Sequence, residues 1–103
     1  MDSLFGLFRP HVKIQNNYLS WEEGEEARSR TVLIQAKLGV RVELLSEEGT
    51  RFKAQLTQVS GRNNYQLKVW PRTTRDFSQE AITLLATLPD GREKLYPVQA
   101  CVE

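Results

Sequence analysis

The sequence predicts an all-β protein, folded as one antiparallel β-sandwich of about seven to eight short strands. Apolar and polar residues alternate with a period of two in one short segment after another, and Gly, Pro and Asn separate these segments. No segment has the sustained i, i+3, i+4 apolar spacing of an amphipathic helix. With 103 residues, of which 40% are hydrophobic and 26% charged, the chain fits one domain that forms its own core.

The clearest element is a hairpin over residues 51–71. The alternation runs through 52–57, stops at a polar turn over 60–64 that contains Gly and Asn, and resumes through 65–69. Val59 is out of phase with Leu56, which predicts either a bulge or the end of the strand near Gln58.

The same alternation predicts strands at 11–14, 18–21, 30–36, 40–44, 81–88 and 95–102. The side chains expected to face the core share the apolar phase of their strands; they are Val32, Ile34, Val42, Leu44, Phe52, Ala54, Leu56, Tyr65, Leu67, Val69, Ile82, Leu84, Ala86, Tyr96, Val98 and Ala100.

The longest connection is 71–78. Because Pro71 has no N–H to donate, we expect it outside any central strand. A connection of this length predicts a crossover between two sheets, and the spacing of the strands favours a sandwich of immunoglobulin-like type. A closed barrel is the alternative, although small barrels usually need more glycine at their corners.

Composition and charge exclude several classes of function. The net charge is +1, and the 14 basic residues are scattered, which argues against a nucleic-acid or anionic-membrane surface. No apolar run approaches the ~20 residues that span a bilayer. The acidic turn at 22–26 lacks the spacing of an EF-hand loop, and one histidine with one cysteine cannot build a structural zinc site, so no metal or cofactor is expected.

Residues 1–11 are expected to form an arm ahead of the sandwich domain at 12–103. Its apolar Phe5 and Phe8 would pack either on the rim of the sandwich or on a neighbouring domain. The arm has no basic segment ahead of its apolar residues and no small-residue cleavage site after them, so it is not interpreted as a signal peptide.

No enzyme is predicted. The chain has no Gly-rich phosphate loop and no nucleophile elbow, and its carboxylates are concentrated in turns. A reactive Cys101 would need a base, for which His11 is the only histidine. We expect Cys101 to be a half-buried residue on the strand face opposite Tyr96 and Val98.

Trp70 is the candidate contact residue. It is out of phase with the inward residues of its strand and near Arg72 and Arg75, a combination that binds a sugar ring or an acidic peptide. The alternative is structural, with Trp70 covering the end of the sandwich under an arginine side chain. Trp21 is expected in the core or at its rim.

Open sandwiches also have edge strands, which partners can use. The predicted edges are the broken first strand, 12–21, and the strand 40–44. Leu33, Leu45, Trp70 and Leu85 are in outward phase and are expected to form a contact patch. The first function expected is a protein-interaction or structural spacer module, whose partner is a second copy of the chain or a neighbouring domain. The alternative is a carbohydrate-binding module that uses Trp70 with Arg72 and Arg75.

The order of several segments resembles a known family. These are Tyr18–Trp21, the strands at 31–35 and 51–56, the segments 65–71 and 81–84, and the closing 96–102. Over 12–103 this order is similar to the short immunoglobulin-like domains of exported bacterial proteins, a family of unknown function related in fold to Hydin-type and major-sperm-protein-like sandwiches. The resemblance implies an immunoglobulin-like fold, no catalytic or cofactor-binding residues, and a place in the cell envelope or periplasm.

Overall fold

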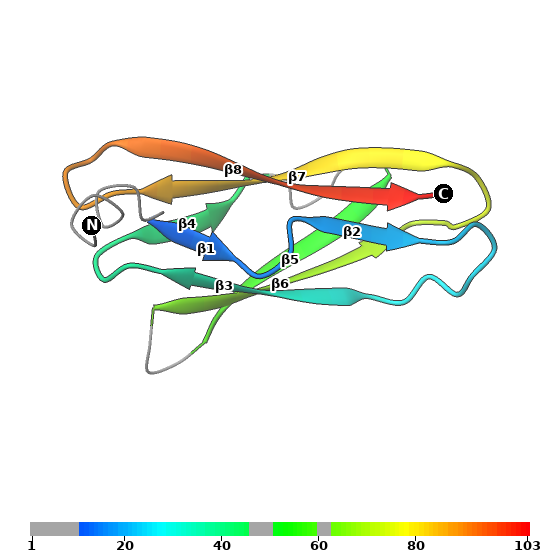
Figure 1. Cartoon of the computed structure of the whole chain (residues 1–103), viewed down its shortest axis with the longest axis horizontal. Coiled ribbons are helices and arrows are strands. Elements are labelled where there is room, and N and C mark those ends of the chain that lie inside the picture. The colour runs from blue at the N-terminus through cyan, green and yellow to red at the C-terminus, as the bar shows by residue number, and fades with distance from the viewer. Residues whose placement is uncertain (1–10, 46–50, 60–62) are drawn as a thin grey trace, which may run out of the picture.

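The structure, a computed structural model, describes residues 11–45, 51–59 and 63–103. Within these ranges the chain forms eight strands and no helix (Figure 1). The strands are β1 (Val12–Ile14), β2 (Tyr18–Trp21), β3 (Arg30–Ala36), β4 (Arg41–Leu44), β5 (Phe52–Val59), β6 (Asn64–Pro71), β7 (Ser78–Thr87) and β8 (Glu93–Val102). The predicted all-β fold class is confirmed, and the expected arm lies almost entirely outside the described residues.

The strands form two four-stranded sheets, in the orders β1-β3-β6-β5 (sheet A) and β2-β8-β7-β4 (sheet B). Figure 1 shows them as two layers, with β7 and β8 above β3 and β6. In the lettering used for immunoglobulin domains, β1 and β2 are the two halves of the first strand, A, and β3 to β8 are strands B to G. The β1-β3-β6-β5 sheet then contains strands A-B-E-D, and the other sheet contains strands C-F-G beside the second half of strand A. This is the arrangement of a constant-type immunoglobulin sandwich, so the predicted sandwich is confirmed.

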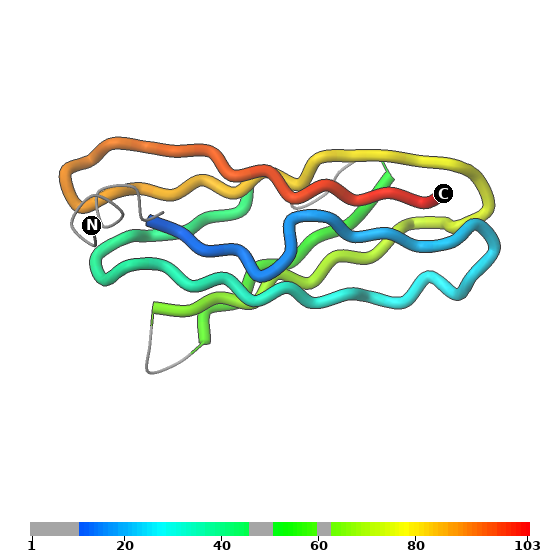
Figure 2. Tube along the Cα trace, in the orientation of Figure 1, coloured from blue at the N-terminus to red at the C-terminus, as the bar shows by residue number. Residues whose placement is uncertain are grey.

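The first strand is broken, as predicted, and its two halves belong to different sheets. β1 pairs antiparallel with β3, whereas β2 pairs parallel with β8. The backbone N–H of Gln15 still donates to Leu33 of sheet A (2.9 Å), but two residues later the carbonyl of Asn17 accepts from Gln99 of sheet B (2.8 Å). The trace in Figure 2 steps between the layers at this point. Polar residues that tolerate irregular backbone make the step possible.

The hairpin of β5 and β6 has no bulge. Its register runs without interruption from Phe52 opposite Pro71 to Val59 opposite Asn64. The predicted bulge is therefore wrong, whereas the alternative, a strand end near Gln58, is confirmed, because β5 ends at Val59. Val59 is out of phase with Leu56 because it points to the outer face, where it is exposed.

Pro71 occupies the last position of a central strand, contrary to the prediction. On the β6 side that faces β3, odd-numbered residues form the hydrogen bonds, as the bond from Ala36 N to Asn63 O shows (3.0 Å). β3 begins at Arg30, which pairs with Val69, so the missing N–H of Pro71 would point beyond the end of β3. The proline therefore removes no hydrogen bond from the sheet. After it, residues 72–77 cross from sheet A to sheet B, as expected for this connection.

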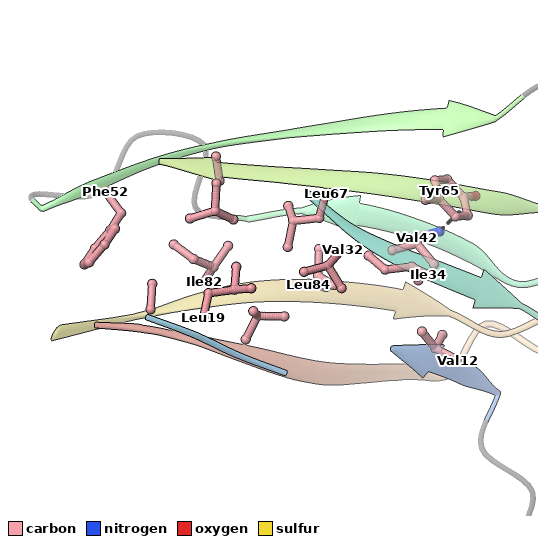
Figure 3. Close-up of a cluster of buried hydrophobic side chains, with 14 of the residues drawn as sticks. Val12, Leu19, Val32, Ile34, Val42, Phe52, Tyr65, Leu67, Ile82 and Leu84 are labelled. Carbon is pink, nitrogen blue, oxygen red and sulfur yellow. Dashed lines mark hydrogen bonds between the residues drawn. The ribbon is translucent and has the colours of Figure 1, made fainter. Parts of the chain in front are cut away.

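The core lies between the sheets and contains the predicted inward side chains (Figure 3). Thirteen of the expected sixteen are buried, and Leu44, Leu56 and Tyr96 are partly buried against the core. Trp21 is 1% exposed and its ring lies 5.6 Å from that of Phe52, which belongs to the other sheet. The prediction that Trp21 belongs to the core is confirmed.

Candidate functional site

Trp70 lies on the outer face of sheet A, directly opposite Lys53 of β5, and is partly buried. Arg72 and Arg75 are exposed residues of the connection between β6 and β7. The backbone N–H of Arg72 donates to the carbonyl of Arg51 (3.0 Å), which continues the ladder of the hairpin by one pair. The three predicted contact residues therefore lie along one end of β6 and the loop that follows it.

A groove of about 310 Å³ adjoins this loop. It is lined by Arg51, Arg72, Thr73, Asp76 and Ser78. Trp70 and Arg75 are not among the lining residues, so this groove does not bring the three predicted residues together. A sugar ring stacked on Trp70 would lie on the open sheet face instead.

The four apolar residues predicted to form one patch are divided between two faces. Leu33 and Trp70 project from the outer face of sheet A, whereas Leu45 and Leu85 belong to sheet B. The single patch is therefore wrong. Sheet A presents a mostly polar outer face, made of Lys13, Thr31, Gln35, Lys53, Gln55, Thr57, Gln66 and Lys68 around the apolar Leu33, Val59 and Trp70.

Sheet B has the more apolar outer face. Leu85 of β7 lies opposite Leu95 of β8 and is diagonal to Leu45, whose N–H donates to Thr83 (3.0 Å). Leu45 is 54% exposed and Leu95 is 63% exposed. We refer to Leu45, Leu85 and Leu95 as the leucine patch. Its next neighbour is Pro97, opposite Thr83.

Charged residues border the leucine patch on one side. Glu43 lies opposite Leu85, and its carboxylate is 3.5 Å from the guanidinium of Arg41. Both side chains are largely exposed, so this ion pair adds little to stability. The arrangement is an apolar centre with charged residues along one side.

Trp21 is held by contacts that leave no aromatic face for a ligand. Its indole N–H donates to the carbonyl of Arg28 (2.7 Å), and the Arg30 guanidinium lies 5.1 Å from the ring centroid. Arg30 also donates to the carbonyl of Ser20 (2.9 Å) and lies 3.6 Å from the carboxylate of Glu25. The tryptophan and the arginine thus fasten the end of sheet B to the start of β3.

Cys101 is buried, not half-buried as predicted, with 5% of its surface exposed. It lies on the expected strand face, between Ser20 of β2 and Gln79 of β7, and the flanking strands cover it. Nearby, the hydroxyl of Tyr18 donates to the Glu103 carboxylate (3.1 Å), and this bond is the main cause that raises the pKa of Tyr18 to about 12.

His11 lies far from this cysteine. The charges that act on its imidazole include Lys94, at the start of β8, whereas Cys101 is near the end of the same strand. Seven residues of extended chain separate Lys94 from Cys101, which corresponds to roughly 20 Å. Partial burial, followed by Lys94, Lys37 and Arg92, lowers the pKa of His11. This histidine is therefore not placed to act as a base for Cys101.

In the described part of the chain, no group of three or more His, Cys, Asp or Glu residues could hold a metal ion. The same residues include no helix long and apolar enough to cross a membrane.

Comparisons with protein-family models, with curated proteins and with solved structures give no match. The assignment of the immunoglobulin-like fold therefore rests on strand order and register.

Proposed function

We propose that this chain is a non-catalytic immunoglobulin-like module that contacts another protein through the outer face of sheet B. The observation that carries the proposal is the leucine patch. Large apolar side chains scattered singly on a surface need no explanation, but adjacent ones with a polar border are typical of contact sites. Leu85 and Leu95 are cross-strand neighbours, and Leu45 is diagonal to Leu85.

The geometry of the patch suits a partner of complementary shape. Leu85 and Leu95 lie within β7 and β8, and Leu45, which directly follows β4, is hydrogen-bonded to β7, so binding would restrict few backbone degrees of freedom. The ion pair of Arg41 and Glu43 would remain at the solvent-exposed rim, where charges influence orientation more than affinity. In the cell envelope, which the family resemblance implies, the partner would be an adjacent domain or another envelope protein. A module of this kind can also act as a spacer between its neighbours.

The second candidate function is carbohydrate binding on sheet A. It is favoured by the position of Trp70 on an outer face rich in glutamine and lysine, residue types that hydrogen-bond sugar hydroxyls. Sugar-binding faces usually present two or more aromatic rings, and the other exposed aromatic side chains in the described ranges, Tyr18 and Phe77, are not on sheet A. Protein contact is therefore the stronger proposal.

A photo-crosslinking experiment tests the proposal. A benzophenone amino acid replaces Leu95 in one variant and Gln66, an exposed residue of sheet A, in a matched control. On irradiation in the cells that make the protein, we expect a discrete adduct from position 95 and none from position 66. Adding Leu85→Glu to the first variant should suppress the adduct, because it places a charge in the centre of the patch.

Equal adducts from both positions, or none from position 95, would refute the proposed face. Specific binding on a glycan array that is lost in a folded Trp70→Ala variant would establish carbohydrate binding instead.

A further inference from the structure

The two sheets end in four edge strands: β1 and β5 in sheet A, and β2 and β4 in sheet B. An edge strand presents backbone N–H and C=O groups without a neighbour, and it pairs readily with a foreign strand unless it is short, charged or blocked. The four edges differ in these protections.

Three of the four edges are short. β1 has three residues, and β2 and β4 have four each. On β4 the N–H of Leu45 donates to β7, so by alternation the N–H of Val42 points away from the sheet. That N–H donates to the Tyr65 hydroxyl (3.3 Å), and the charged Arg41 and Glu43 flank it. The β4 edge is therefore both charged and partly occupied.

The first half of β8 is also an edge, because β2 pairs only with its residues 99–102. The N–H of Gln99 donates toward β2 (2.8 Å), so odd-numbered residues of β8 point to that side. Pro97 is one of them, and it has no N–H to offer a foreign strand. A proline at an edge position is a known protection against pairing.

Beyond Lys53, β5 has none of these protections in the described residues. It is eight residues long, and its register with β6 is continuous. From Gln55 to Val59 it contains no charged residue and no proline. Arg51 O accepts from Arg72 N, so odd-numbered residues bond to β6 and the backbone groups of Ala54, Leu56 and Gln58 face outward.

Among the described residues, this edge lies beside a groove. The groove, of about 590 Å³, lies between β4 and β5. Leu44, Ala54 and Leu56 supply its apolar lining, and Glu43 and Gln55 supply polar groups. Leu44 and Leu56 pack against the core cluster and are only partly buried, so covering this side would complete their burial.

We propose that β5 pairs antiparallel with β5 of a second copy of this chain, about a two-fold axis at Leu56. In this register Ala54 lies opposite the partner's Gln58 and Leu56 opposite the partner's Leu56. About six backbone hydrogen bonds form, two for each of the three hydrogen-bonded pairs. The two sheets A then join into one continuous sheet.

The charges and the symmetry favour a second copy over an unrelated strand. In this register Gln55 faces the partner's Thr57, and Lys53 faces the partner's Val59, so no like charges meet. A two-fold axis makes the same uncharged segment both halves of the interface. The contact uses neither the leucine patch nor Trp70, and is thus separate from the function proposed above.

Two double variants test the register. In Gln55→Glu/Thr57→Glu, the carboxylate introduced at position 55 faces a second carboxylate at position 57 of the other copy. In Gln55→Glu/Thr57→Lys, the same carboxylate faces an ammonium group at that position instead. Both variants place the carboxylate at position 55 opposite Lys68 of β6, so within one chain they differ only at position 57. By sedimentation velocity we expect the wild-type chain and the Gln55→Glu/Thr57→Lys variant to form dimers, and the Gln55→Glu/Thr57→Glu variant to bind about tenfold more weakly.

Hydrogen exchange provides an independent measurement. The amide of Leu56 should exchange slowly in the dimer and rapidly in the Gln55→Glu/Thr57→Glu variant, whose thermal stability is measured to confirm folding. A wild-type chain that stays monomeric up to ~1 mM overturns the proposal. Equal dimerisation of the two double variants, or a dimer with an unprotected Leu56 amide, overturns it as well. None of these outcomes changes the expected Leu95 crosslink.

Discussion

Replacing Tyr65 with phenylalanine tests a hydrogen bond between the two sheets. Tyr65 of sheet A is 6% exposed, and its hydroxyl accepts the N–H of Val42 of sheet B at 3.3 Å (Figure 3). The same hydroxyl lies 3.5 Å from the Asn63 side-chain oxygen. Phenylalanine keeps the ring and removes only the hydroxyl, so the Val42 N–H is left without its partner.

The expected cost follows from that buried N–H. An unsatisfied buried donor costs about 1–3 kcal/mol. Because both distances are long and β4 is at the edge of its sheet, we expect the lower part of this range, about 1–2 kcal/mol. For a chain of this size each kcal/mol lowers the melting temperature by about 4–8 °C.

The assay is urea unfolding followed by tryptophan fluorescence, and the control is Tyr18→Phe. The Tyr18 hydroxyl also donates a hydrogen bond, to Glu103, but Tyr18 is 46% exposed, so water replaces that bond and the loss should stay within about 0.5 kcal/mol. If Tyr65→Phe costs no more than Tyr18→Phe, the hydrogen bond between Val42 and Tyr65 contributes nothing to stability, which contradicts the prediction.

Three further predictions concern the core, the cysteine and the histidine. Leu67→Ala should lower the free energy of unfolding by ~2–5 kcal/mol because Leu67 is fully buried, whereas Leu33→Ala, at a 47% exposed position, should change it little; similar losses would contradict the assigned faces. Cys101 should react with a thiol reagent only as fast as the chain opens, and immediate stoichiometric labelling would show that it is accessible. The pKa of His11, measured by NMR, should lie below 6.5. The unfolded chain then binds a proton at a higher pH than the folded chain does, so the free energy of unfolding should fall as the pH drops through 6.5. The His11→Gln variant should lack the part of this pH dependence that His11 causes. A midpoint at or above 6.5 would disprove it.

The period-two alternation was sufficient to predict the fold class and most of the core. Inward residues such as Ile34, Leu67 and Ile82 are fully buried, because on a strand the phase of one residue fixes the phase of its neighbours. The crossover after Pro71 was predicted correctly for a similar reason: its length and its proline are local features.

The predictions that proved wrong depend on how the strands pair with one another. The position of Pro71 within β6 is harmless only because β3 begins at Arg30, and the sequence near Pro71 carries no information about that. Likewise, Cys101 is buried because β2 and β7 flank it. The alternation predicts on which face of the sheet a side chain lies, but not which neighbouring strands bury it.

The candidate surfaces depend most on strand order, and here the sequence was least informative. Leu33 and Leu85 have the same outward phase, yet they lie on opposite faces of the sandwich. The sequence did not indicate Leu95 as part of a surface patch, because its neighbour Leu85 belongs to another strand. The sequence did not predict that β5 is an edge strand. Its pairing with β6 is visible in the local pattern, but whether another strand pairs on its other side depends on the order of strands in the sheet.

The most direct test of the proposed function is the size of the complex that the chain forms in its native cells. The measurement compares, by gel filtration of cell extracts, the tagged wild-type chain with Leu45→Glu/Leu95→Glu and with the control Thr31→Glu/Leu33→Glu on sheet A. We predict that the first variant elutes as a free chain or as a dimer of itself, and that the control elutes with the larger wild-type complex. Elution of the Leu45→Glu/Leu95→Glu variant with the wild-type complex would contradict a contact through the leucine patch.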